Sequence, residues 1–109
     1  MGDLKLTYQV DGGDLVQAGE ASSQMKMTLK KLGLPPEIIR KASVCMYEGE
    51  INMVIHADGG RVEVEVGMDA ITIRLIDQGT KELNIVLGVD DGDYEQAMQA
   101  IFDSFFPKN

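Results

Sequence analysis

Two stretches of alternating side chains constrain the fold of this chain more than any other feature. Apolar residues occupy every second position at 62–66 and again at 71–75, on either side of a turn at Gly67-Met68-Asp69. A period of two gives each stretch one apolar face, as in a half-buried β-strand. The turn residues between them indicate a hairpin. Arg74 can then lie opposite Glu63 or Glu65, which predicts a cross-strand ion pair.

Helices and a further strand are predicted on the N-terminal side of this hairpin. Residues 4–10 alternate in the same way and predict a strand. Apolar residues from Leu15 to Leu32 recur at three- and four-residue spacing, which predicts a helix capped by Asp14 and stopped by Gly33. A second helix is expected from Pro35-Pro36 to about Ala57, because proline is tolerated in a first helical turn.

The C-terminal part predicts one more strand and one more helix. The strand covers Leu83–Val89, and the helix begins in the acidic run at 90–93 and ends before Pro107. The order is then strand, helix, helix, strand, strand, strand, helix in a single domain of residues 1–109. We therefore predict an α/β (α+β) fold: a two-layer sandwich with a four-stranded mixed sheet and three helices mostly on one face.

Composition narrows the class of protein. The formal net charge of −8 at pH 7 repels phosphate backbones, so we expect neither nucleic-acid nor anionic-membrane binding. A single cysteine, Cys45, excludes a disulfide within one chain and is interpreted as a small core residue. The sequence has neither a signal peptide nor an apolar run of membrane-spanning length. We expect a soluble, cytoplasmic protein.

Polar residues that can carry chemistry gather on the second helix and at the end of the hairpin. Glu48, Asn52 and His56 are spaced by four residues and share one helical stripe. Carboxylate and amide oxygens one turn apart can converge on one hard cation. Asp77 follows the last strand of the hairpin, with Gly79 two residues on. In a less specific interpretation the stripe is a solvated face, His56 is a helix-end residue and Asp77 caps a strand.

Three segments carry a resemblance to a known family. Gly19–Ser23, Tyr47–Ala57 and Asp77–Gly79 resemble the histidine-kinase-like ATPase fold of anti-sigma regulatory serine kinases. The likeness covers about residues 1–79. It implies Mg²⁺ and ATP as ligands, and a sigma factor or an anti-sigma antagonist as partner.

The resemblance also implies roles for individual residues. Glu48 would be the catalytic general base, and Asn52 would ligate Mg²⁺ through its amide oxygen beside the nucleotide. Asp77 would accept a hydrogen bond from the adenine amino group. Gly79 would let the backbone pass close to the base, and His56 would lie near the same pocket.

The family pattern stops at Gly79. Lys81 stands where a second glycine is expected, and the glycine-rich lid that surrounds phosphates is missing. Residues 80–109 instead resemble the closing strand–helix unit of the regulatory domains of aspartate kinases, the ACT type. We interpret the chain as a chimera of two family fragments.

Three functions follow from this interpretation. The first is a degenerate Mg²⁺–ATP module with weak or no nucleotide binding and no turnover. The second is a functional ATP-binding anti-sigma regulatory factor or kinase domain. The third, amino-acid binding by the ACT-like end, has the least support. Two sheet edges and the aromatic residues Phe102, Phe105 and Phe106 further predict a homodimer.

Overall fold

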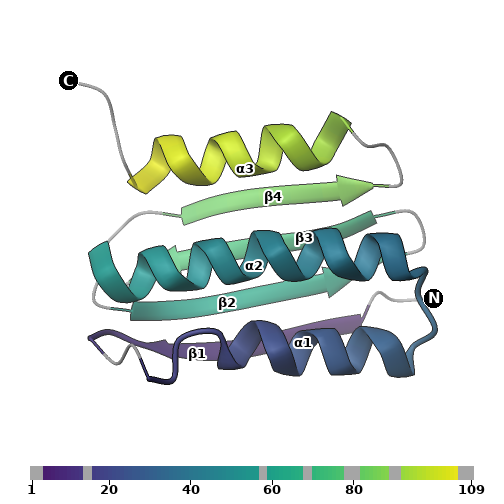
Figure 1. The fold of residues 1–109 in the computed structure, drawn as a ribbon, viewed down its shortest axis with the longest axis horizontal. Coiled ribbons are helices and arrows are strands. Elements are labelled where there is room, and N and C mark those ends of the chain that lie inside the picture. Colours follow the sequence, from purple (N-terminus) through teal and green to yellow (C-terminus); the bar gives the residue numbers. More distant parts are fainter. Residues whose placement is uncertain are drawn as a thin grey trace.

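The computed structural model describes residues 4–13, 16–56, 59–67, 70–77, 82–88 and 92–105 (Figure 1). The elements are β1 (Leu4–Asp11), α1 (Glu20–Lys31), α2 (Pro36–His56), β2 (Gly59–Val66), β3 (Ala70–Asp77), β4 (Glu82–Gly88) and α3 (Gly92–Phe105). This order confirms the predicted fold class, an α+β sandwich of a four-stranded sheet and three helices.

The sheet is antiparallel throughout, in the order β1-β2-β3-β4. The prediction of a mixed sheet was wrong in this detail. The chain crosses the molecule twice between β1 and β2, once in α1 and once in α2, and so returns to the end where β1 finishes (Figure 1). Asp11 accordingly pairs with Gly59, the first residue of β2, and the two strands run in opposite directions.

All three helices cover one face of the sheet, and the core lies between the two layers (Figure 1). Helix α2 lies over the middle strands, while α3 packs against both β4 and α2. The fully or almost fully buried side chains from the sheet are Val62, Val64, Ile71, Ile73, Leu75, Ile85 and Leu87. Met25, Met46, Met53 and Ile101 meet them from the helices. Burial of these side chains supplies the main driving force for folding.

The uncovered face of the sheet carries a ladder of charges. Arg74 lies directly opposite Glu63, and its Nη1 is 3.4 Å from Glu63 Oε1, which confirms the predicted cross-strand pair. Arg61 donates to the other oxygen of Glu63 at 3.0 Å. This hydrogen bond is the main reason that the pKa of Glu63 lies below its usual value. Because these groups are exposed, they contribute mainly solubility and strand register.

Helix α1 begins later than the sequence predicts. Its first residue is Glu20, whereas the apolar stripe starts at Leu15, and the predicted cap Asp14 lies outside the described residues. Gly19 precedes the helix with a left-handed φ of 96° and provides no side-chain cap. The first N–H groups of α1 therefore need another acceptor, which α2 provides.

Candidate functional site

The polar stripe of α2 is present, but its members differ in exposure. Asn52 is 9% exposed, Glu48 is half-buried, and His56 is exposed as the last residue of the helix. The Asn52 side chain donates from Nδ2 to the backbone oxygen of Glu48 at 2.7 Å. This bond fixes the amide against its own helix and leaves its oxygen for another partner.

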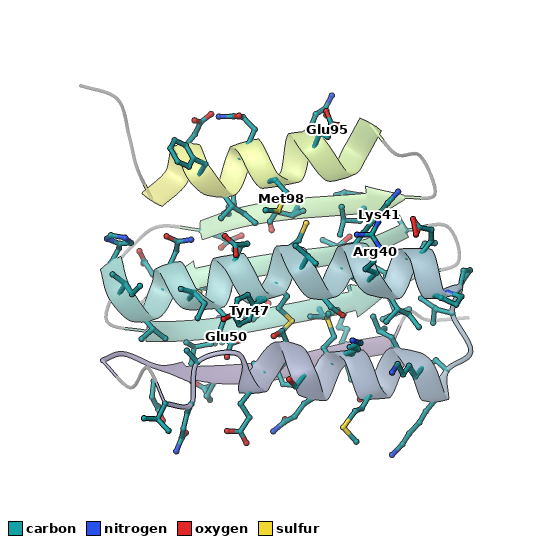
Figure 2. All side chains as sticks on the ribbon, in the orientation of Figure 1. Arg40, Lys41, Tyr47, Glu50, Glu95 and Met98 are labelled. Carbon is teal, nitrogen blue, oxygen red and sulfur yellow. The ribbon has the colours of Figure 1, made fainter. Side chains whose placement is uncertain are left out.

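The stripe faces α3. Cys45 lies one turn before Glu48 and two turns before Asn52, and its thiol contacts the sulfur of Met98 at 3.8 Å. In Figure 2, Met98 extends from α3 toward α2. Burial raises the pKa of the Cys45 thiol to about 11, with a second contribution from the Glu48 carboxylate. Helix α3 therefore packs along the side of α2 that carries Glu48 and Asn52.

Asp77 ends β3 on the helix-covered face of the sheet. It is half-buried and pairs with Gly60, in the same row as buried Val10. A Cβ added to Gly60 would lie 2.8 Å from the Cα of Asp77 and 2.6 Å from Cε of Met53. Asp77 and the C-terminal half of α2 thus meet at one end of the sheet. Gly79 lies outside the described residues.

Glu48, Asn52, His56 and Asp77 line none of four cavities that are formed by other described residues. In the same part of the chain, no cluster of three or more His, Cys, Asp or Glu residues could hold a metal ion.

The sequence pattern did not indicate the role of another carboxylate of α2, Glu50. It is 2% exposed, and its two oxygens accept the backbone N–H groups of Ala21 and Ser22, each at 3.1 Å. Figure 2 shows Glu50 and Tyr47 on the α1 side of α2, opposite α3. Glu50 thus supplies the missing N-terminal cap of α1, where a negative charge also complements the helix dipole. The signal in the sequence that could have indicated this role is the position of an acidic residue beside the buried positions Gly49 and Met53.

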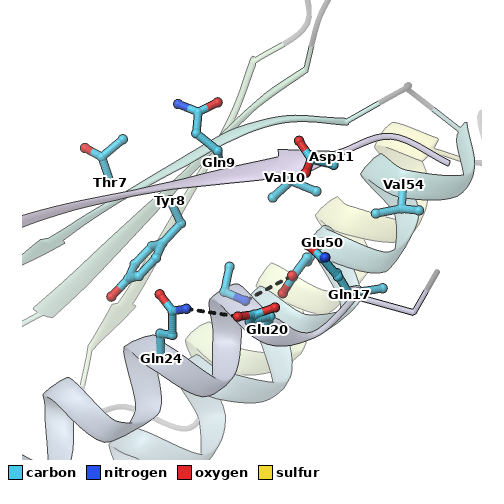
Figure 3. A pocket seen from close by; sticks show the side chains of 12 residues that line it. Thr7, Tyr8, Gln9, Val10, Asp11, Gln17, Glu20, Gln24, Glu50 and Val54 are labelled. Atoms are coloured by element: carbon cyan, nitrogen blue, oxygen red, sulfur yellow. Dashed lines mark hydrogen bonds between the residues drawn. The ribbon is translucent and has the colours of Figure 1, made fainter. Parts of the chain in front are cut away.

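The cavity beside Glu50 runs between β1 and α1 (Figure 3). Its volume is about 270 Å³. One wall is the strand segment 7–11, the other is formed by residues of α1 and the turn before it, and Glu50 and Val54 form the floor. Tyr8 reaches across to Thr28 of α1, and partial burial raises the pKa of its phenol.

Comparison with known proteins found no matching family model, no similar curated protein and no similar solved structure. Among the described helices, none is long and apolar enough to cross a membrane.

Proposed function

We propose that this chain is a degenerate Mg²⁺–ATP-binding module related to anti-sigma serine kinases, with weak or no nucleotide binding and no turnover. The observation that carries the proposal is the position of α3. It packs on the side of α2 where Glu48 and Asn52 would have to face a nucleotide, and Met98 contacts Cys45 on that side.

The sequence after Asp77 supports the same conclusion. Lys81 replaces the second glycine of the family pattern, and no glycine-rich lid follows. Each phosphate hydrogen bond that is lost costs about 1 kcal/mol, so a few of them turn micromolar binding into millimolar binding. Positioning supplies most of the acceleration in phosphoryl transfer, so Glu48 alone should not support turnover.

One observation favours the alternative, a functional ATP-binding regulator. The oxygen of the Asn52 amide is not used in its bond to Glu48, and Asp77 lies at the same end of the molecule. Adenine recognition through Asp77 and Mg²⁺ ligation by Asn52 would then both persist. The partner would be a sigma factor or an anti-sigma antagonist.

Titration calorimetry with ATP, with and without Mg²⁺, separates the two functions. We expect no saturable binding in the micromolar range and no phosphate release. Low-micromolar binding that needs Mg²⁺ and disappears in Asn52→Ala would overturn the proposal. Asn84→Ala is the matched control, because it removes an exposed asparagine from the open face of the sheet. Phosphate release that is lost in Glu48→Ala would contradict the absence of turnover.

We also propose a homodimer formed through β4 and α3. Within the described chain, β4 pairs only with β3, and Val86 and Phe102 expose 56% and 53% of their surface. Exposed strand edges and apolar side chains favour association with a second copy. Light scattering at micromolar concentration should give twice the monomer mass. A monomer at every concentration would reject the dimer.

A further inference from the structure

The outer edge of β1 lines the cavity between β1 and α1. Residues 7, 8, 9, 10 and 11 all contribute to the wall of the cavity (Figure 3). Successive side chains of a strand point to opposite faces, so five consecutive residues can line one cavity only along the edge of the strand. In the described part of the chain, β1 pairs with β2 alone. Alternate backbone N–H and C=O groups of β1 therefore face the groove without a strand partner.

The groove is acidic. Asp11, Glu20 and Glu50 all line it, and no lysine or arginine is among the described residues that do. Glu50 is buried and holds the start of α1, whereas Asp11 and Glu20 are exposed. Glu20 and Glu50 lie on the helix-covered side of β1 at one end of the groove, whereas the side chain of Asp11 points to the opposite side of the strand (Figure 3).

We propose that an extended peptide segment of a partner protein adds to β1 as a fifth strand in this groove. A lysine or arginine of the peptide, on the helix-covered side of the added strand, is directed at Glu20. Main-chain hydrogen bonds along the edge supply affinity, and the acidic end supplies specificity. The cavity volume of about 270 Å³ lies just below the range of about 300–1,000 Å³ that is usual for drug-sized ligands, which favours a strand with one inserted side chain over a buried small molecule.

Fluorescence anisotropy with short acetylated peptides tests the charge requirement. Threonine and valine alternate in each labelled peptide, and the central residue is Arg, Gln or Glu. The Arg peptide should bind at least about tenfold more tightly than the Glu peptide. Glu20→Gln should weaken the Arg peptide about threefold and leave the Gln peptide unchanged, whereas Asp11→Asn, on the opposite face of β1, should change neither. Glu95→Gln is the control, because this exposed carboxylate of α3 lies away from the groove (Figure 2).

Backbone methylation of the peptide tests strand addition without changing the protein. Two versions of the Arg peptide carry N-methyl groups on alternate residues. The odd-numbered residues are methylated in one version and the even-numbered residues in the other, so each version blocks the hydrogen bonds of one edge of the peptide strand. One version should lose binding and the other should keep it, because only one edge of an added strand faces β1. Equal binding of both versions would overturn the proposal.

Amide chemical shifts locate the bound peptide. Shifts confined to residues 7–11 and 17–24 would support the proposal, and shifts centred on β4 would overturn it. A different result is dimerisation of the protein through β1, with the amides of β1 protected and no reversal by the peptide. That result would assign the edge of β1 to a second copy of the chain and would also overturn the proposal.

Discussion

At the scale of single residues, two carboxylates that are two positions apart on α2 have different roles. Glu48 lies on the α3 side near Cys45, and Glu50 lies on the α1 side, where it accepts two backbone N–H groups. A two-residue step turns a helix by more than half a circle, so the two groups cannot act on the same ligand. The sequence motif indicated Glu48, but Glu50 is the residue whose side chain accepts the two hydrogen bonds from the start of α1.

Replacement of Glu50 should destabilise the protein. In Glu50→Ala the N–H groups of Ala21 and Ser22 lose a charged acceptor, and α1 has no side-chain cap of its own. We expect the free energy of unfolding from urea titration to fall by about 2–4 kcal/mol. Glu48→Ala on the same helix is the control, with an expected loss below about 1 kcal/mol. Equal losses in the two variants would contradict the capping role.

Cys45 should be unreactive in the folded protein. Its pKa of about 11 keeps the thiol protonated at pH 8, and its side chain has no exposed surface. Reaction with a disulfide reagent at that pH should be at least about a hundredfold slower than in urea. Because folding raises this pKa, its contribution to stability is complete below the unfolded value and is lost as pH rises toward 11. Modification at the rate of the unfolded chain would contradict the buried contact with Met98.

At the scale of elements, most boundaries were predictable from local pattern. The hairpin of β2 and β3 and the end of α2 match the expected positions within three residues, because periodicity and turn residues act locally. The predicted start of α1 was wrong because the cap of this helix comes from Glu50, a residue distant in sequence. The strand directions were not predictable from local pattern either, since they depend on how the two helices return the chain to the sheet.

The junction of α2, β2 and β3 depends on Gly60. Its φ is 149°, and an added Cβ would lie 2.1 Å from the backbone oxygen of Ile76. Gly60→Ala should therefore lower the free energy of unfolding by more than about 2 kcal/mol. Gly33→Ala is the matched control. It also has a positive φ, of 80°, but nothing lies within 4 Å of its added Cβ, so its cost should be about 1 kcal/mol. A smaller loss at Gly60 than at Gly33 would show that the strand junction differs from this description.

At the scale of the whole molecule, the radius of gyration of 13.1 Å is that of a compact domain of this length. The fold places its candidate sites on two sides of α2: the Glu48–Asn52 stripe toward α3, and the groove with Glu50 toward α1. The sequence indicated the first site through the spacing of three polar residues. It could not indicate the second, because the groove forms only when β1 and α1 are brought together by the fold.

Methyl NMR tests most directly whether α3 packs on the Glu48–Asn52 side of α2. In protein labelled at its methionine methyl groups, a NOESY spectrum should connect the Met98 methyl group to the side chain of Cys45, whose sulfur is 3.8 Å from that of Met98. Met27, which is 60% exposed on α1, serves as the internal control and should show no such contact. A spectrum in which Met98 contacts no residue of α2 would contradict the account and would leave the stripe open to a nucleotide.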